Sequence, residues 1–437
     1  MVKAVKFGGS SLASAEQFKK VADIIRSDPD RRYVVASAPG KRNSHDEKVT
    51  DLLLQCYHLA CDKRSIDETF DKITARFNGI IKDLGLDFSL EEDLAGIKVS
   101  ILHHASCDYI ASRGEYLNSK VLANYLGFAF VDAEDGIFFD ENGHLDQEKT
   151  DRKLGKILAL HEYAVIPGFY GSTPNGSIKT FSRGGSDITG SIVARAAGAD
   201  IYENWTDVSG MLMADPRIVD DPRPIPEITY RELRELSYMG ASVMHEDAIF
   251  PVRKAQIPIN IRNTNDPSAP GTMIVPKAQS NVVETVITGV AGKKGITAIH
   301  IEKDMMNSEV GFGMKVLEVI QNHNISFEHL PSGIDTMSVL VSSKSIEECK
   351  GSITAEMVKK VDPDSIDLVE NLCLIAIVGR GMISNKGTAA RIFSALATED
   401  VNIRMIDQGS SEINIIVAVD ERDYEKTIKT IYREFVK

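Results

Sequence analysis

The chain has 437 residues, 43% of them hydrophobic, which predicts two to four domains with sizeable cores and excludes a disordered protein. Its net charge of −13 without a long basic tract argues against nucleic acid as a partner, and no apolar run reaches the ~18 residues of a membrane span. The five cysteines lack C-x-x-C spacing and the N-terminus lacks a signal-peptide pattern, so we expect reduced thiols and a cytoplasmic protein.

The first motif is the turn Gly8-Gly9-Ser10-Ser11, which follows the predicted strand Val2–Phe7. Adjacent glycines let backbone N–H groups come close to a ligand, and Lys6 places a positive charge beside them. Ser14 and Gln17 fit a capping box at the start of the next helix. The pattern predicts a phosphate site at this turn; an ordinary Gly-Gly turn beside a surface lysine is the alternative.

Short apolar runs then alternate with longer helical patterns up to about residue 285. The expected strands are 2–7, 33–37, 128–132, 164–167, 201–205 and 257–261, and the expected helices include 115–126, 187–197 and 229–239. This alternation predicts a three-layer α/β domain with a largely parallel sheet. Ligands of such sheets bind outside the carboxyl ends of the strands, where the glycine and serine clusters of this chain occur.

A second glycine-rich helix start is Arg183-Gly184-Gly185-Ser186-Asp187. Free N–H groups and the helix dipole favour an anion there, and the Arg183 guanidinium suits a carboxylate or a phosphate. Asp187 could simply cap the helix, but its position across two glycines from Arg183 indicates a ligand site.

Two further clusters are polar. Thr206 and Asp207 follow a predicted strand and, with Arg217 after a loop, suit a nucleotide; a turn with a surface salt bridge is the alternative. Glu115, expected in the first turn of a helix, suits a cation such as an amino group, and a glutamate that only stabilises the helix dipole is the alternative.

The C-terminal part repeats itself. Gly311, Leu317 and Gly333 are matched by Gly387, Phe393 and Gly409, each pair 76 positions apart (387 − 311 = 76). Each copy reads as a strand, a glycine turn, an amphipathic helix and further strands. The pattern predicts one small α/β unit used twice.

Together these motifs resemble those of the aspartokinases, a group in the amino-acid kinase family. The resemblance covers nearly the whole chain and rests on motifs in the family's order: Lys-Phe-Gly-Gly-Ser-Ser at residue 6, Ser37-Ala38-Pro39-Gly40, Val49-Thr50-Asp51-Leu52, Arg113-Gly114-Glu115, Arg183-Gly184-Gly185-Ser186-Asp187, Thr206-Asp207-Val208-Ser209-Gly210 and Asp215-Pro216-Arg217. It implies a three-layer amino-acid-kinase-like domain over residues 1–285. Two ferredoxin-like ACT domains then follow, over 286–368 (completed by the C-terminal segment) and 369–437.

The resemblance also implies a reaction: phosphorylation of the β-carboxylate of L-aspartate by ATP with Mg²⁺, giving 4-phospho-L-aspartate at the start of lysine, threonine and methionine biosynthesis. Its implied catalytic residues are Lys6 and Asp187. The implied substrate contacts are Ser37, Thr50, Glu115, Arg183 and Gly184. The implied nucleotide contacts are Lys6, Gly8, Gly9, Ser10, Thr206, Asp207, Leu212, Arg217 and Ser242. Many members carry tyrosine at Leu212 and lysine at Ser242.

For the repeat, the resemblance implies feedback control by lysine, with or without threonine, and a homodimer or a dimer of dimers paired through ACT domains. The expected effector residues are Met306, Ser308, Gly311, Ser326, Phe327, Glu328, Gly333 and Asp335. We expect no fused homoserine dehydrogenase. The alternatives are a kinase of the same fold acting on glutamate, carbamate or a nucleoside monophosphate, and a non-catalytic amino-acid sensor.

Overall fold

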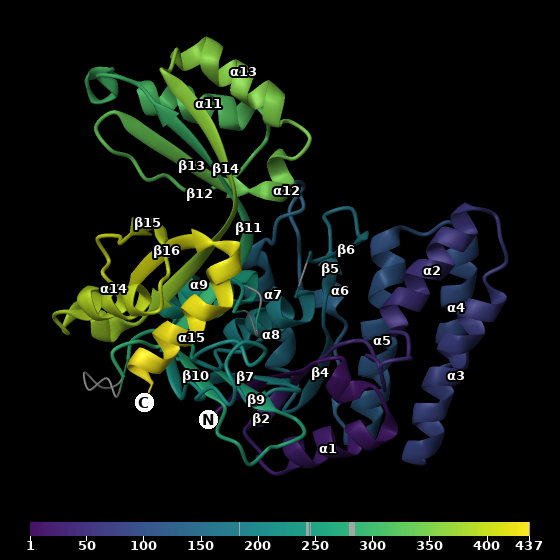
Figure 1. Ribbon diagram of the computed structural model, residues 1–437. Coiled ribbons are helices and arrows are strands. Elements are labelled where there is room, and N and C mark those ends of the chain that lie inside the picture. The colour runs from purple at the N-terminus through teal and green to yellow at the C-terminus, as the bar shows by residue number, and fades with distance from the viewer. Residues whose placement is uncertain (183, 242–243, 245, 279–284, 437) are drawn as a thin grey trace. The chain divides into compact units, whose positions relative to one another are not determined.

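The computed structural model describes residues 1–182, 184–241, 244, 246–278 and 285–436 (Figure 1). The chain forms two compact units. The first comprises residues 1–211, 224–230 and 243–279, and the second comprises 212–223, 231–242 and 280–437. The domain boundaries expected at residues 285 and 368 stay predictions.

The first unit is built on an eight-stranded sheet in the order β3-β4-β2-β1-β7-β9-β10-β8. Neighbouring strands run parallel except β9 and β10, so the expected largely parallel sheet is confirmed. The strands are β1 (Lys3–Phe7), β2 (Arg31–Ala36), β3 (Ala129–Phe130), β4 (Ala164–Pro167), β7 (Ile201–Thr206), β8 (Glu227–Thr229), β9 (Ile259–Asn263) and β10 (Thr272–Val275). A separate hairpin pairs β5 (Tyr170–Ser172) with β6 (Ile178–Thr180).

Helices cover both faces of this sheet. Successive side chains of a strand point to opposite sides, so each strand packs against helices on both faces. Val5 and Phe7 of β1 belong to a core cluster shared with helices α1 to α5, whereas Lys6 pairs with Asp187 of α8. The helices of this unit are α1 (Ala15–Arg26), α2 (Val49–Cys61), α3 (Asp67–Leu84), α4 (Glu91–Leu102), α5 (Cys107–Leu126), α6 (Ala133–Gly136), α7 (Gln147–Leu158), α8 (Gly185–Ala196), α10 (Phe250–Ala255) and the 3-10 turns η1 (Ser10–Leu12) and η2 (Glu246–Ile249).

Two expected helix starts are tested directly. The Ser14 half of the capping box is confirmed, since the Ser14 hydroxyl accepts a hydrogen bond from the Gln17 N–H at 3.4 Å. The reciprocal half is wrong, because Gln17 Oε1 accepts no hydrogen bond from the described residues and its Nε2 donates to Asn265. The expected helix start near Glu115 is wrong: α5 begins at Cys107, with Ser106 as its cap, and Glu115 lies in its middle. Gly114 suggested a start, but it serves close packing, because a Cβ there would lie 2.8 Å from Ala38 Cβ. The alternative of a first-turn glutamate is therefore also wrong.

The second unit contains the repeat, which is confirmed at matching residue intervals. Strand β14 (Ser365–Val378) follows β11 (Gly289–Glu302) by 76 positions (365 − 289 = 76), and α14 (Thr388–Thr398) follows α11 (Phe312–Asn322) by the same interval (388 − 312 = 76). Gly311 and Gly387 precede these helices at φ 85° and 83°, a left-handed conformation that favours glycine.

The two copies share one six-stranded sheet in the order β12-β13-β11-β14-β16-β15. The long strands β11 and β14 pair antiparallel in the middle, so each copy completes the other's sheet. The remaining elements are β12 (Phe327–His329), β13 (Thr336–Ser342), β15 (Ile403–Asp407), β16 (Asn414–Asp420), α9 (Tyr230–Tyr238), α12 (Ser343–Ile346), α13 (Lys350–Val361), α15 (Tyr424–Phe435), η3 (Met306–Ser308), η4 (Arg380–Ile383) and η5 (Glu421–Asp423). Among the described residues, no helix combines the length and apolar character needed to cross a bilayer.

Helix α8 approaches β7 so closely that Gly190 has no room for a side chain: a Cβ there would lie 2.6 Å from Tyr202 Cζ. We expect Gly190→Ala to lower the free energy of unfolding by about 1–3 kcal/mol through overpacking. Gly96→Ala is the control, because a Cβ there meets nothing within 4 Å. Denaturant titration of both variants checks this, and equal stability would contradict the packing argument.

Candidate active site

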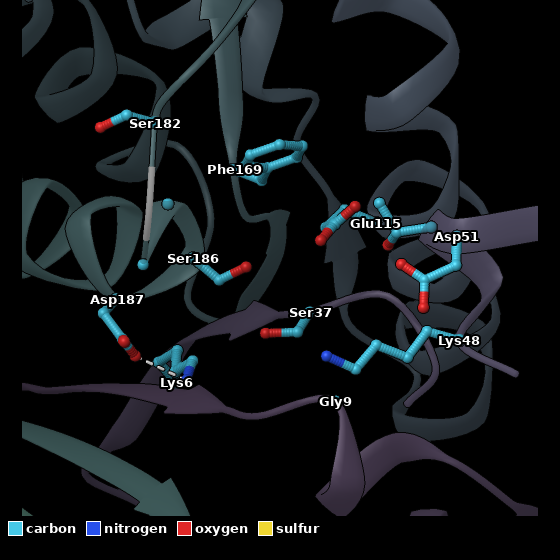
Figure 2. Close-up of a pocket in the computed structure, with 13 residues that line it drawn as sticks. Lys6, Gly9, Ser37, Lys48, Asp51, Glu115, Phe169, Ser182, Ser186 and Asp187 are labelled. Carbon is cyan, nitrogen blue, oxygen red and sulfur yellow. Dashed lines mark ion pairs between the residues drawn. The ribbon is translucent and has the colours of Figure 1, made fainter. Parts of the chain in front are cut away.

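A cavity of about 490 Å³ opens at the carboxyl ends of β1 and β2 in the first unit (Figure 2). Its walls come from the first turns of α2 and α8 and from the middle of α5. Its lining residues are Lys6, Gly9, Ser37, Lys48, Thr50, Asp51, Glu115, Phe169, Ser182, Gly184, Gly185, Ser186 and Asp187. This is the edge of a parallel sheet at which ligands bind.

Lys6 and Asp187 form an ion pair on the floor of this cavity, 2.6 Å from Nζ to Oδ1. The lysine comes from the end of β1 and is 7% exposed, and the aspartate comes from the first turn of α8. Asn204 on β7 donates to the same Asp187 oxygen at 2.9 Å. Asp187 therefore holds the Lys6 amino group in one position beside the glycine turn.

The glycine turn depends on close backbone approach and not on dihedral angles that only glycine adopts readily. Gly9 has φ −61°, an ordinary helical value. The Gly40 N–H donates to the Gly9 carbonyl at 2.8 Å, and a Cβ on Gly40 would lie 2.6 Å from the Gly9 carbonyl carbon. Glycines at these positions let the turns after β1 and β2 touch. The Gly8 N–H donates to the Trp205 carbonyl at 3.0 Å, so it is not free for a ligand.

Two helix N-termini reach the same cavity. Lys48 and Gly184 precede α2 and α8, and neither helix has a side-chain cap. Residues of both first turns line the cavity. Uncapped N–H groups and the positive ends of two helix dipoles favour anions, by ~0.3–1 kcal/mol per charge when exposed and up to ~2 when partly buried. The site is therefore suited to a ligand with several negative charges.

Glu115 is a carboxyl group buried in the opposite wall. It is 6% exposed, and its Oε2 has no hydrogen-bond partner. Burial raises the pKa of Glu115 to about 8, although a hydrogen bond from the Ala38 backbone and the charge of Arg113 act in the other direction. A buried carboxyl group that lines a cavity and has one unpaired oxygen is suited to bind a positively charged group of a ligand.

Arg113, although close to Glu115 in the sequence, is held by other side chains. Its guanidinium is 5% exposed and stacks on three rings, 4.4 Å from the centroid of Tyr109, 4.7 Å from Tyr116 and 5.1 Å from Tyr170. It also donates to Ser112 Oγ. Because Arg113 is held by these contacts, the Glu115 carboxyl group remains available to a ligand.

The structure brings seven of the expected site residues together in the cavity: Lys6, Gly9, Ser37, Thr50, Glu115, Gly184 and Asp187. Four others lie at or just beyond the ends of β1 and β7 without lining it: Gly8, Ser10, Thr206 and Asp207. Leu212 and Arg217 belong to the second unit, where Arg217 is exposed and pairs with Asp215 at 2.7 Å. Arg183 and Ser242 lie outside the described residues. The roles of all these residues stay predictions.

Sequence reasoning assigned no role to Lys48 or Phe169. Lys48 directly precedes the Val49-Thr50-Asp51-Leu52 motif, so its place at the start of that helix was a usable signal. Phe169 has φ 80°, a strained value for an aromatic residue, and a Cβ on Gly185 would clash with its ring. Only the packing of the ring against the first turn of α8 places Phe169 in the cavity wall.

The expected effector residues lie in the first copy of the repeat. Met306 and Ser308 lie in η3, and Gly311 precedes α11. Ser326 precedes β12, which contains Phe327 and Glu328, and Gly333 and Asp335 precede β13. Backbone hydrogen bonds from Lys303 to Asp335 and from Asn307 to Ile334 join the η3 loop to the β12–β13 loop. Glu328 pairs with Lys293 at 2.5 Å, and its second oxygen is buried without a partner.

Among the described residues, no three His, Cys, Asp or Glu side chains gather to hold a metal. Asp187 and Asp51 each add one carboxylate to the cavity wall. Mg²⁺ in phosphoryl-transfer sites is commonly held by one or two carboxylates, by water and by the phosphates themselves. This donor set therefore fits a magnesium ion that arrives with a nucleotide, and it does not fit a dedicated protein cage.

The raised pKa of Glu115 predicts a pH-dependent stability. Between pH 4.5 and 8 the folded chain keeps a proton that the unfolded chain releases, so stability falls as pH rises through this window, by on the order of 4 kcal/mol. We expect Glu115→Gln to remove this component. Calorimetric melting of both proteins from pH 5 to 8.5 measures the difference. Parallel curves would show that Glu115 titrates normally.

Comparisons with known proteins agree with this geometry. The model of the amino acid kinase family matches residues 1–263, and an ACT domain model matches residues 375–435. Aspartokinase 3 of Bacillus subtilis is 38% identical, covering 99% of this chain and 98% of that protein. The chloroplastic aspartokinase 1 of Arabidopsis thaliana is 31% identical, covering 99% and 79%.

Among solved structures, the crystal structure of Clostridium acetobutylicum aspartate kinase is 51% identical and superposes with a TM-score of 0.91, covering 99% of both chains. The match extends through both the eight-stranded sheet of the first unit and the repeated C-terminal unit. The chain therefore belongs to the amino acid kinase family and, within it, to the aspartokinases.

Proposed function

We propose that the chain transfers the γ-phosphoryl group of ATP to the β-carboxylate of L-aspartate, giving 4-phospho-L-aspartate and ADP. The observation that carries this proposal is the single cavity in which a lysine, two uncapped helix N-termini and a buried carboxyl group face one another. The aspartokinase relatives support the choice of substrate.

The chemistry requires little more than this arrangement. The acceptor carboxylate is already ionised at neutral pH, so no general base is needed. The obstacle is the repulsion between that carboxylate and a triphosphate, and it is overcome by positioning and by neutralising charge. A magnesium ion bound with the nucleotide, held near Asp187 or Asp51, supplies further positive charge when it is present.

The residues of the cavity divide between the two ligands. Lys6, oriented by Asp187, and the N–H groups of Gly9 and Ser10 in the glycine turn serve the phosphates. Glu115 binds the ammonium group of aspartate, while Thr50 and Ser37 donate hydrogen bonds to its carboxylates. Following the resemblance to aspartokinases, Arg183 is assigned to the α-carboxylate, and Thr206 and Asp207 to the nucleotide.

Glu115 also separates this proposal from its nearest alternative. Carbamate and nucleoside monophosphates carry no ammonium group that the buried carboxyl group of Glu115 could bind, so a kinase for them would have no use for this residue in the cavity wall. Glutamate differs from aspartate by one methylene group, and for that choice the proposal rests on the relatives. The Lys6–Asp187 pair is intact, which disfavours a sensor that has lost catalysis.

A hydroxamate assay for acyl phosphate tests the proposal. We expect product from aspartate with Mg-ATP and little from glutamate. Lys6→Ala should lower kcat by about 10²–10³-fold, because it removes a preorganised charge at the reacting phosphoryl group. Lys3→Ala, on the same strand but outside the cavity lining, is the control for folding. Undiminished turnover in the Lys6 variant would contradict its assignment.

We further propose that the repeated unit binds a feedback effector, lysine with or without threonine, and that it pairs chains into a homodimer or a dimer of dimers. The first copy carries several large apolar side chains that are exposed: Met305, Val310, Met314, Phe327 and Ile334. Exposed apolar side chains that gather in a patch are typical of a protein–protein interface.

All five cysteines are free thiols, which supports the expected cytoplasmic location.

Effector binding is tested by measuring the initial rate with lysine, threonine or both at saturating concentration. Coupling of ~1–3 kcal/mol predicts a change in substrate affinity of roughly 5–150-fold. Asp335→Ala should weaken the effect, because the Asp335 side chain accepts the Met305 N–H at 3.0 Å and shapes the loop. Rates unchanged by either amino acid would contradict the assignment of the effector.

A further inference from the structure

The loop between β2 and α2 is fastened by an arginine that belongs to neither element. Arg76 lies on α3 and is 7% exposed. Its guanidinium donates to both oxygens of Asp46 at 2.6 Å, to the Gly40 carbonyl at 3.1 Å and to the Glu47 carbonyl at 3.3 Å. One buried side chain therefore holds the beginning and the end of an eight-residue segment (47 − 40 + 1 = 8).

This segment connects the two parts of the cavity that face anions. Gly40 at its beginning touches the glycine turn through the Gly9 carbonyl. Glu47 at its end is followed by Lys48 and the uncapped first turn of α2. Because Arg76 fixes both ends, it sets the distance between the glycine turn and the start of α2.

Lys48 is the residue that this arrangement presents to the ligand. Its amino group points into the cavity, toward Gly9 and Ser37 (Figure 2). Lys6 is neutralised by Asp187, whereas Lys48 pairs with no carboxylate among the described residues. Lys48 thus adds a positive charge that no carboxylate of the described residues pairs with, next to the turn assigned to phosphate.

We propose that Lys48 binds the transferring phosphoryl group and that Arg76 is a positioning residue that acts through Lys48. This inference rests on the proposed phosphoryl transfer and adds two residues to it. Arg76 suits the task because its planar guanidinium spans a carboxylate and two carbonyls, which an ammonium group cannot do. Hydrogen bonds from Arg42, together with the charge of Arg76, hold the pKa of Asp46 well below its ordinary value, so Asp46 is a carboxylate near neutral pH.

A double-mutant cycle tests the link between the two residues. We expect Lys48→Met to lower kcat/KM for Mg-ATP by ~10- to 100-fold and Lys48→Arg to restore most of it. Arg76→Lys should lower the same parameter by about 10-fold alone, yet by little in the Lys48→Met background, because its effect acts through Lys48. A merely structural arginine would lower the melting temperature and multiply its loss with that of Lys48→Met, and this result would overturn the inference.

Matched variants keep the test sharp. Lys41→Met removes an exposed charge from the same loop, outside the cavity lining, and should leave kcat/KM unchanged. Asp46→Asn replaces Arg76→Lys if that variant does not fold, since it keeps the shape of the side chain and removes its charge.

Calorimetric binding of a non-hydrolysable ATP analogue with Mg²⁺ to all four members of the cycle separates this inference from the proposed reaction. If the wild-type protein binds the analogue but does not phosphorylate aspartate, the proposed substrate is wrong while the cycle still decides the roles of Lys48 and Arg76. Equal affinity of the Lys48→Met and wild-type proteins for the analogue would overturn the phosphate contact.

Discussion

The contact between Gly9 and Gly40 is the constraint on which the cavity depends. It joins the turns that follow two neighbouring parallel strands, and it leaves no room for a Cβ on Gly40. Parallel pairing of β1 with β2 brings both carboxyl ends to one edge of the sheet. The hydrogen bond from the Gly40 N–H to the Gly9 carbonyl then joins the two turns at that edge, where Gly9 and Ser37 line the cavity.

Some charged groups of the cavity are paired within the protein, and others are not. Lys6 is held by Asp187, which in turn accepts a hydrogen bond from Asn204, so this part of the floor is electrically balanced and rigid. Within the described part of the chain, Lys48 and the buried Glu115 form no ion pair on the walls. The unbalanced groups are the ones that a ligand with phosphate at one end and ammonium at the other can satisfy.

The C-terminal unit is built from two copies of one repeat that depend on each other. Because β11 and β14 are long and pair with each other, neither copy of the repeat has a complete sheet alone. Helix α9 also belongs to this unit, with Glu232 bonded to Thr288 and to Arg380 at the turn after β14. It directly follows β8 of the catalytic sheet, so a short stretch of chain links the two units.

Local chemistry was enough to predict the alternation of strands and helices, the Ser14 cap, the repeat of 76 residues and most residues of the cavity, because each depends on neighbours in the sequence or on a motif. The position of Glu115 within α5, the closeness of Gly9 and Gly40, and the entry of Phe169 into the cavity wall were decided by tertiary structure. Each of these depends on contacts between segments far apart in the chain. The same holds for Arg76, whose role comes from α3 packing against a loop about thirty residues earlier; a sequence pattern carries no record of such a contact.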